Sequence, residues 1–488
     1  MAKRPDGYLT PQKRPKVFLA GLNYYDETPL IVERDRPLHA IYYGGTGSGK
    51  TAMLAFAIEQ AVHAGEHVIV IDLKGMDCIL YAAMCAAAER CGIDPPKYLT
   101  NRHRASTYLV PVLQAEWWKH TFSSEEKAGA LMTALGLADV QSHDWWSDAA
   151  EALYSFVTDE VDPDEIDTFV KFYDVLERRK RDLPKELRNA TVHAAILARR
   201  LERIAMFNPD GNAPPEAIEH AIDLQDLVRS GKQTLVFASL NSLRTQKTSS
   251  TIARFLGRAL LLAADALEEN QRGRSLIAVD EAQNCLGPGF TDVCLTLSRS
   301  AGVSFHAGFQ DISVLRHRGI DYAALFDENA HLQFMFAAQS PDAIRRQVVL
   351  SGERLEFNYS KTFTYPGFFG HRSWSETFSG HITNRFSIND ILEVSADPQR
   401  FIFRCTKDST LCQLRGLPVM AKVIWHISKE EFQRRSAMSW PEPCNRTVMC
   451  GASKLHSLPD ATDANIPIPS TGIPPTTDKP IVLRPPRR

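Results

Sequence analysis

One eight-residue stretch constrains the folds open to this chain more than any other feature. It matches the pattern G-x-x-x-x-G-K-[ST] at every specified position and reads Gly44, Gly45, Thr46, Gly47, Ser48, Gly49, Lys50 and Thr51. An apolar run at residues 39–43 precedes it, and residues 52–58 follow with helical composition. Strand, glycine-rich loop and helix are the context that a phosphate-binding loop requires. A glycine-rich turn that matches the pattern by chance is the alternative.

The loop residues have separate expected roles in holding a nucleoside triphosphate. Glycines let backbone N–H groups turn toward phosphate oxygens, and the N-terminus of the following helix adds partial positive charge. We expect Lys50 to reach the β- and γ-phosphates and Thr51 to ligate Mg²⁺. Because the chain has no Asn-Lys-x-Asp stretch for recognition of a guanine base, ATP is the expected nucleotide.

An acidic pair lies at the end of a second apolar run. Residues 276–279 read as a short buried strand, and Asp280 and Glu281 follow it directly. We expect Asp280 to ligate Mg²⁺ and Glu281 to orient and polarise the attacking water. A strand end that is acidic without chemical purpose is the alternative. Together with the phosphate loop, the pair predicts an enzyme that hydrolyses ATP.

Two further side chains are candidates for sensing and completing such a site. Gln310 follows the apolar run 303–308, where a polar group can respond to the presence of the γ-phosphate. Arg299 precedes the same run and is a candidate arginine finger for the nucleotide of a neighbouring subunit. Ordinary exposed surface positions are the alternative for both residues.

Apolar runs and helical periodicity predict an α/β chain with a large insertion. Strand-like runs occur at 68–71, 234–238, 276–279, 303–307 and 331–336, with helical segments between them. Residues 105–225 lack such runs and show helical spacing. We therefore expect a basic N-terminal segment at 1–36, a nucleotide-binding domain at 37–104 and 226–435, an all-helical inserted domain at 105–225, and a Pro-rich tail at 436–488.

Positive and negative charges are balanced over the chain, so a nucleic-acid partner would have to bind a local basic patch. Lysine and arginine number 56 against 58 aspartate and glutamate, for a formal net charge of -2. Residues 178–203 carry nine basic and three acidic side chains and are one candidate for holding phosphates. A solvated helix face is the alternative. The aromatic stretch 357–374 is a second candidate, which we interpret as a packed loop or a subunit interface in preference to a surface for stacking bases.

Neither a secretory signal nor a membrane-spanning run is visible in the sequence. The most apolar stretch, residues 255–267, is interrupted by Arg258 and Asp265. The nine cysteines include no C-x-x-C pair, which favours a reducing cytosol. We expect a cytoplasmic protein without a transmembrane segment, placed peripherally at the inner membrane if it serves a membrane apparatus.

The order of these motifs resembles the type IV secretion coupling proteins of the VirD4/TraD/TraG group, within the HerA–FtsK superfamily of DNA-pumping ATPases. The resemblance spans about residues 37–427. It depends on the following segments: His39 before the phosphate loop, Ile71-Asp72-Leu73-Lys74-Gly75, Val279-Asp280-Glu281, Ser298-Arg299-x-x-Gly302, Phe309-Gln310-Asp311, Asn329 before a strand, Arg385-Phe386-Ser387-Ile388-Asn389-Asp390-Ile391-Leu392, and Arg400-Phe401-Ile402-Phe403.

This resemblance implies a RecA-like nucleotide-binding domain, a ring of six identical subunits with ATP between neighbours, and DNA in a central channel. It also implies relaxase or secretion-system subunits as partners. Members usually carry an N-terminal pair of transmembrane helices, whereas here the loop begins 43 residues from the start. A separate membrane subunit is one explanation. A soluble HerA-like motor for DNA repair, packaging or defence is another, and a nucleotide-switched docking adaptor for secretion substrates is a third.

Overall fold

The computed structural model describes two long ranges of the chain and several short pieces between them. These are residues 17–75, 78–101, 115–123, 169–179 and 221–440, with isolated positions 109, 110, 112, 126, 127, 165 and 181. Gaps within the last range are 288–289, 318–319, 338–339, 365–372, 398, 408–413, 415 and 425–426.

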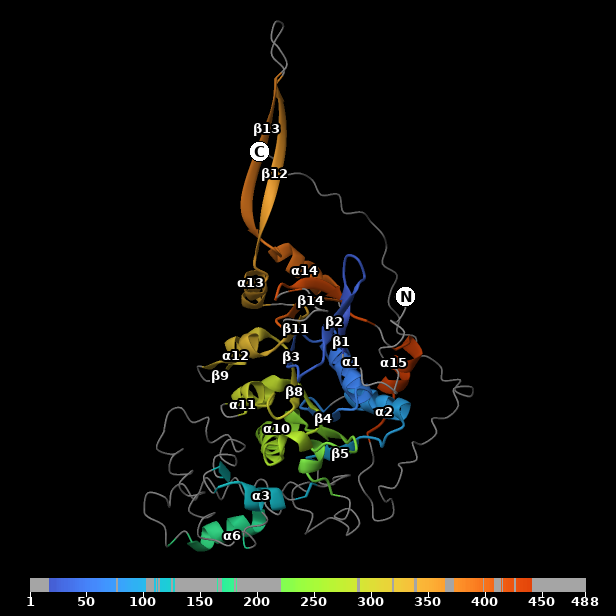
Figure 1. The fold of residues 1–488 in the computed structure, drawn as a ribbon, viewed down its shortest axis with the longest axis vertical. Coiled ribbons are helices and arrows are strands. Elements are labelled where there is room, and N and C mark those ends of the chain that lie inside the picture. Colours follow the sequence, from blue (N-terminus) through green and yellow to red (C-terminus); the bar gives the residue numbers. More distant parts are fainter. Residues whose placement is uncertain are drawn as a thin grey trace. The chain divides into compact units, whose positions relative to one another are not determined.

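A large mixed sheet organises the described chain (Figure 1), and seven neighbouring strands in it are parallel. In spatial order these are β11 (Leu332–Met335), β3 (Ala40–Tyr43), β8 (Val303–Phe309), β7 (Ser275–Asp280), β4 (His67–Asp72), β6 (Leu235–Ser239) and β5 (Lys97–Thr100). Six of them coincide with apolar runs seen in the sequence. Because parallel strands end at one edge, the segments after β3, β7 and β8 meet there.

Four antiparallel strands extend the sheet beyond β11. Their order is β14 (Arg400–Cys405), β15 (Val419–Lys422), β1 (Val17–Asn23) and β2 (Pro29–Glu33). The expectation of a basic segment over residues 1–36 is therefore wrong for its second half. Residues 17–33 belong to the sheet because β1 pairs with β15, a partner some 400 residues away that local sequence patterns do not reveal.

Helices cover both faces of the sheet. The strand β4 requires this, because its successive side chains point to opposite faces and all of them are buried. Val68 and Val70 face a core shared with α1 (Lys50–His63) and α2 (Ile79–Cys91). Ile69 and Ile71 face the other core, to which α10 (Ser242–Asp265), α11 (Thr291–Thr296), α12 (Tyr322–Asn329) and α13 (Pro341–Leu350) contribute. The expected α/β fold is thus confirmed as a three-layer arrangement around a buried sheet.

The chain continues past the sheet through α14 (Ile388–Ala396) and α15 (Lys429–Ser436). Beyond α15, the Trp440 ring lies 5.5 Å from the Tyr98 ring and 6.0 Å from the Tyr81 ring, measured between centroids. Residues 437–440 are therefore part of the folded domain. The Pro-rich remainder of the expected tail lies outside the described residues.

Only parts of the expected all-helical insertion are described. They include α3 (Glu116–Thr121) and α6 (Phe169–Arg179). Trp117 and Trp118 on α3 are buried in the larger core, which they share with strands of the sheet such as β4. Trp145, Trp146 and most of the basic stretch 178–203 lie outside the described residues, so the insertion stays a prediction. None of the helices in the described part of the chain has the length and apolarity needed to cross a membrane.

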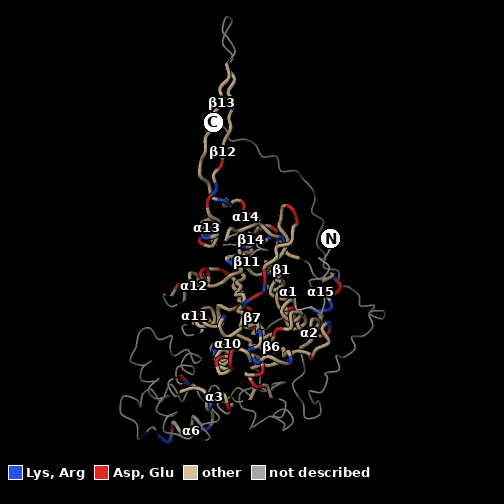
Figure 2. Tube along the Cα trace, viewed as in Figure 1, with Lys and Arg blue, Asp and Glu red and all other residues tan. Residues whose placement is uncertain are grey.

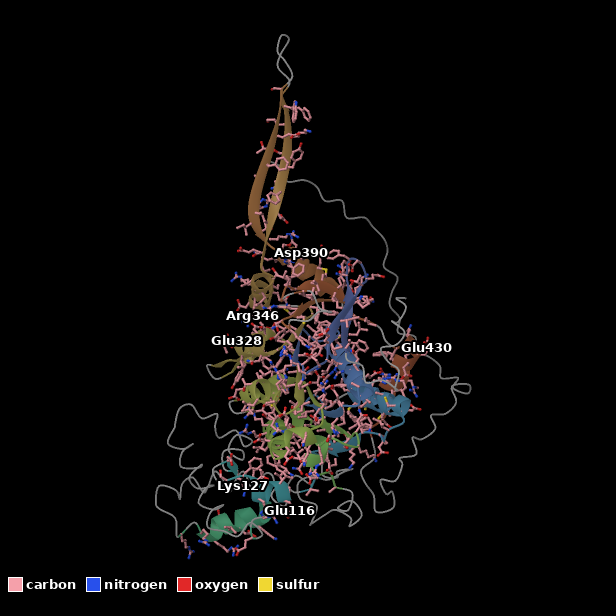
Figure 3. All side chains as sticks on the ribbon, viewed as in Figure 1. Glu116, Lys127, Glu328, Arg346, Asp390 and Glu430 are labelled. Atoms are coloured by element: carbon pink, nitrogen blue, oxygen red, sulfur yellow. The ribbon has the colours of Figure 1, made fainter. Side chains whose placement is uncertain are left out.

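A separate two-stranded ribbon joins α13 to α14 (Figure 1). It consists of β12 (Glu353–Thr364) and β13 (Ser373–Asn384), which pair only with each other. Figure 3 shows their side chains standing out from the ribbon. Interpretation of the aromatic stretch as a packed loop is wrong for these strands, since Phe357, Phe363 and Trp374 are more than half exposed. Two further short strands are β9 (Arg316–His317) and β10 (Ile320–Asp321).

Candidate functional site

The phosphate loop connects the completely buried strand β3 to α1. Each residue of β3 pairs with β11 on one side and β8 on the other, which fixes the position of the strand end. Two backbone hydrogen bonds continue this restraint into the loop, from Gly44 N to Phe309 O (3.2 Å) and from Gly45 N to Ala337 O (3.2 Å). The loop is therefore anchored to two neighbouring strand ends.

Only glycine fits at the first loop position. A Cβ on Gly44 would lie 2.6 Å from Phe336 Cβ and 2.7 Å from Ser48 Oγ. At the other end of the loop, Gly49 caps α1 with φ 99° and ψ -1°, in the left-handed region that favours glycine. Gly49 therefore lets the chain turn from the loop into α1, whose first turn carries free backbone N–H groups.

Lys50 is folded back into the loop. Its Nζ donates to Gly44 O (2.5 Å) and Gly45 O (2.9 Å), and the residue is only 7% exposed. Burial lowers the pKa of the Lys50 ammonium, and the nearby Glu281 and Asp280 carboxylates oppose that effect. The loop lysine therefore lies near both residues of the acidic pair.

Asp280 is the last residue of β7, and its carboxyl is buried at the strand end. Burial, and then repulsion from Glu281, raises the pKa of Asp280 to about 6. On the neighbouring strand β8, Gly308 leaves room for this carboxyl, since a Cβ there would lie 3.1 Å from Asp280 Oδ1. A buried carboxyl with a second acid beside it is a site suited to a cation.

Glu281 follows in a backbone conformation that is uncommon for a residue with a side chain. Its φ of 57° and ψ of 45° lie in the left-handed region. Such a conformation costs on the order of 1–2 kcal/mol for a residue other than glycine. The turn redirects the chain at once into the short helix 282–285, and Gln283 Nε2 donates to Glu281 Oε2. The carboxylate is thus oriented by its own turn and by a neighbouring amide.

A third acidic residue at this edge, Asp72, was not among the predicted site residues. It ends β4 directly opposite Asp280 in the strand register, and its Oδ1 accepts from Lys74 N (2.9 Å) and Gly75 N (3.0 Å). Lys74 acts on the pKa of both Lys50 and Asp280. The signal was present in the sequence, because Asp72 ends the strand that follows the loop helix.

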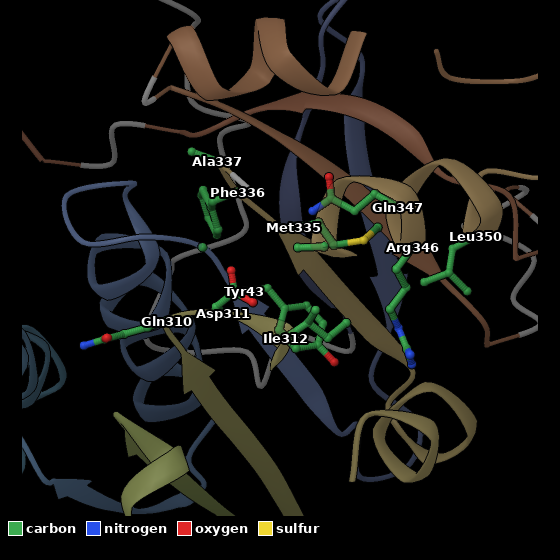
Figure 4. A pocket seen from close by; sticks show the side chains of 12 residues that line it. Tyr43, Gln310, Asp311, Ile312, Met335, Phe336, Ala337, Arg346, Gln347 and Leu350 are labelled. Atoms are coloured by element: carbon green, nitrogen blue, oxygen red, sulfur yellow. The ribbon is translucent and has the colours of Figure 1, made fainter. Parts of the chain in front are cut away.

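Gln310 directly follows β8, next to the loop, on the rim of a small cleft. Figure 4 shows its side chain pointing away from the other lining residues, toward the side of the view on which α1 lies. Tyr43, Asp311 and Met335 line the interior of the cleft. Asp311 is held there by Ser340 Oγ at 3.2 Å. The cleft thus opens beside Gly44, the first glycine of the loop.

Arg299 lies at the opposite edge of the sheet. It precedes β8, whose seven residues separate it from Gln310, so it lies about 20 Å from the loop of its own chain. Its guanidinium is near Asn329 O (3.5 Å), just before β11. Burial and the nearby Arg36 lower the pKa of Arg299. Arg299 is therefore out of reach of the nucleotide site in the same subunit.

The residues that meet at the loop fit a magnesium nucleotide. The Ser48 hydroxyl is 6% exposed yet has no hydrogen-bond partner among the described residues, so it is free to bind an anionic oxygen. Thr51 and Asp280 offer the hard oxygen atoms that Mg²⁺ prefers. Lys50 supplies positive charge between the loop and the acidic pair.

Comparison with known families and structures agrees with this arrangement. Residues 27–208 match the family described as the type IV secretion-system coupling protein DNA-binding domain. No curated protein sequence matches the chain.

Several solved structures share the fold. The bacterial conjugative coupling protein TrwBdeltaN70, in an unbound form, is 12% identical with a TM-score of 0.57, and the match covers 84% of this chain and 88% of that one. Plasmid coupling protein TrwB in complex with ADP and Mg²⁺ is 12% identical with a TM-score of 0.56, covering 84% and 90%. VirB4 of Thermoanaerobacter pseudethanolicus is 14% identical with a TM-score of 0.52, covering 85% and 98%.

Proposed function

From its likeness to type IV coupling proteins, which confirms the resemblance and the RecA-like fold expected from the sequence, we propose that this chain hydrolyses ATP to translocate DNA. It delivers DNA, or DNA with bound protein, to a transfer apparatus. The observation that carries this proposal is the convergence of Lys50, Asp280 and Glu281 at one edge of a parallel sheet. Phosphoryl transfer to water needs a positive charge near the phosphates, a group that holds the metal ion, and a carboxylate that accepts a proton from the water.

Each residue has one task in the proposed reaction. Backbone N–H groups of residues 44–49 bind the phosphates, and Lys50 neutralises charge on the β- and γ-phosphates as it develops. Thr51 and Asp280 would hold Mg²⁺, which when bound neutralises phosphate charge. Glu281 accepts a proton from the attacking water. The fixed turn at Glu281 and the Gln283 amide orient its carboxylate for this step. Gln310 senses the γ-phosphate from the end of β8.

A ring of six subunits completes the proposed site. Arg299 belongs to the edge of the sheet away from its own loop, so a contribution to ATP hydrolysis requires a neighbouring chain. In a ring, each subunit offers its Arg299 to the nucleotide bound by the next subunit and stabilises charge in the transition state. The proposed assembly is therefore a homo-hexamer with ATP at each interface.

DNA is the proposed polymer on which the ring acts. Support comes from the matched family over residues 27–208, whose description names DNA binding. Relaxase or secretion-system subunits are proposed as partners, together with a separate membrane subunit that holds the ring at the cytoplasmic side of the inner membrane.

Displacement of a triplex-forming strand tests translocation directly. The chain is mixed with a long duplex that carries a labelled third strand, and release of the label is followed after ATP is added. We expect release with ATP and Mg²⁺, and none with ADP or with the Glu281→Gln variant. Glu269→Gln, at an exposed position in the segment before β7, is the matched control and should release the strand normally. ATP hydrolysis without strand release would contradict translocation and leave an ATPase of another kind.

A further inference from the structure

The ribbon β12–β13 has one apolar face and one polar face. The strand register places Leu355 opposite Ile382, Tyr359 opposite Phe378, and Phe363 opposite Trp374. Because side chains alternate between faces, these residues and Phe357 share one side of the ribbon. The other side carries only polar residues: Arg354, Glu356, Asn358, Ser360, Thr362, Thr364, Ser373, Ser375, Thr377, Ser379, His381 and Thr383.

This apolar face is exposed to an unusual extent. Its large side chains have exposed fractions between 49% and 71%. Among the described residues, fourteen large apolar side chains are exposed, and seven lie on this face. Three more, Val349, Ile388 and Leu392, lie on the flanking helices α13 and α14. An exposed apolar patch of this size marks an interaction surface.

Three charges lie on this face: Glu353 is at the end of the ribbon next to α13, and the two in the middle of the face form a pair that is compatible with burial. Lys361 Nζ lies 2.7 Å from Glu376 Oε1, and the same oxygen accepts from Tyr359 Oη at 2.5 Å. Lys361 Nζ is also 5.0 Å from the centre of the Trp374 ring. The pair is therefore neutral and hydrogen-bonded within the ribbon, so a partner can cover it without meeting an unpaired charge.

Charge argues against nucleic acid and anionic lipid as the partner. The two strands carry two basic and three acidic side chains, and Figure 2 shows the ribbon mostly without charged residues. Phosphate-bearing partners are held chiefly by lysine and arginine, which this face does not supply in excess. This charge balance favours a protein surface with a matching apolar face as the partner.

We propose that the apolar face of β12–β13 binds the same face of a second copy of this chain. Among the described residues, no other exposed apolar patch of comparable size is present, so within the described part of this chain the matching surface is the patch itself. An interface that uses one patch twice is isologous, the arrangement of twofold symmetric dimers. This inference does not depend on the proposed function.

Area and fold stability both support this pairing. If about 100 Å² of each of seven side chains is covered, two copies together bury about 1,400 Å², within the usual range of a specific interface. An isolated two-stranded ribbon is marginally stable in water. Packing two such ribbons face to face gives four strands around a common apolar layer, which is a small β-sandwich.

Sedimentation of the full chain without nucleotide tests the proposal. A triple variant of the apolar face, Leu355→Thr, Phe357→Thr and Phe378→Thr, should lower the self-association constant at least tenfold. The matched control places threonine on the polar face, as Asn358→Thr, Ser360→Thr and Ser379→Thr, and should associate like the unaltered chain. Equal association of all three proteins would overturn the proposal.

Thiol cross-linking provides a second measurement that leaves most of the face intact. Residue 359 lies near the middle of β12, and packed sheets lie about 10 Å apart, so the cross-linker is a bismaleimide of about that reach. It should join Tyr359→Cys into a covalent dimer and should not join Ser360→Cys, which lies on the opposite face. Equal cross-linking of the two variants would count against the pairing. A second result would also count against the pairing. In that case the apolar triple variant would lose binding to phosphatidylcholine vesicles or single-stranded DNA, while its self-association persisted.

Discussion

At the scale of single residues, Glu281 separates nucleotide binding from hydrolysis. Its carboxylate is the proposed proton acceptor, whereas the phosphates are bound by the loop and Lys50. Glu281→Gln keeps the size of the side chain and its amide contact with Gln283 but cannot take the proton. We expect ATP to bind normally and turnover to fall at least about 100-fold.

Single-turnover kinetics with labelled ATP measure both quantities on one sample. Bound, unhydrolysed ATP should accumulate in Glu281→Gln, and Glu269→Gln, at an exposed position, should behave like the unaltered chain. Normal hydrolysis by Glu281→Gln would mean that another group activates the water. Asp72, which ends the neighbouring strand, would then be the first residue to test.

Buried histidines make the stability of the fold sensitive to acid. Burial lowers the pKa of His39 and His306 to about 3 and that of His331 to about 4. His306 is held by hydrogen bonds with Tyr42 Oη (3.0 Å) and Leu38 O (3.2 Å). The folded state keeps these rings neutral, while the unfolded chain takes up protons below about pH 6.5. Stability therefore falls as the pH drops below 6.5 and continues to fall toward pH 3.

Urea unfolding at pH 7.5 and pH 5.0 tests this pH dependence. Each strongly shifted histidine contributes about 1.4 kcal/mol per pH unit, so His306→Gln should reduce the loss of unfolding free energy between the two pH values by about 2 kcal/mol. His120→Gln, at an exposed position on α3, is the control and should leave the loss unchanged. An unchanged loss in His306→Gln would show that His306 is protonated in the folded state.

At the scale of elements, β1 is an integral strand of the sheet. Phe18 is 2% exposed, and its ring lies 6.3 Å from the Phe334 ring of β11. Phe18→Ala should cost about 3–5 kcal/mol of unfolding free energy, as large-to-small changes of buried aromatic residues do. Chemical denaturation measures the loss, with Tyr25→Ala, at a 75% exposed position, as the control. A loss as small as that of the control would place β1 outside the cooperative fold.

Sequence patterns predicted the elements whose partners and burial follow from local rules. Six of the seven parallel strands were visible because both faces are buried, which gives continuous apolar runs such as residues 276–279. The loop residues and Asp280 were visible because their chemistry fixes both residue type and spacing. Strands β1 and β2, at one end of the sheet, were missed because β1 joins the sheet by pairing with β15, far along the chain.

The ribbon β12–β13 was interpreted differently for a related reason. Its aromatic residues were interpreted as a packed loop or a subunit interface, because sequence alone did not tell whether the surface that covers them lies in the same chain. The position of Arg299 was also beyond local rules. Its distance from the loop depends on β3 and β8 being parallel neighbours.

At the scale of the whole molecule, the proposed ring predicts complementation between two inactive subunits. Arg299→Ala should bind ATP nearly normally and hydrolyse it about 1,000-fold more slowly, because a finger acts mainly in the transition state. A mixed interface between Arg299→Ala and Glu281→Gln subunits unites an intact Glu281 with an intact Arg299. Small amounts of Arg299→Ala protein added to Glu281→Gln protein should therefore restore activity.

The complementation assay needs verified mixed oligomers and a neutral control. Arg345→Ala, at an exposed position on α13, should keep full activity alone. Mixed oligomers without recovered ATP hydrolysis would remove Arg299 from the chemistry of the neighbouring subunit. The proposed ring would then have no demonstrated role in ATP hydrolysis.

The steady-state rate of ATP hydrolysis, measured with and without DNA, tests the central claim most directly. A motor that couples phosphate-bond cleavage to movement on DNA should hydrolyse ATP faster when single- or double-stranded DNA is present. Lys50→Ala should abolish hydrolysis under both conditions, since the loop then lacks its phosphate-neutralising charge. Lys232→Ala, an exposed lysine far along the sheet near β6, is the matched control. We predict a DNA-stimulated rate that depends on Lys50. A rate that neither form of DNA changes, or hydrolysis that persists in Lys50→Ala, would contradict the account.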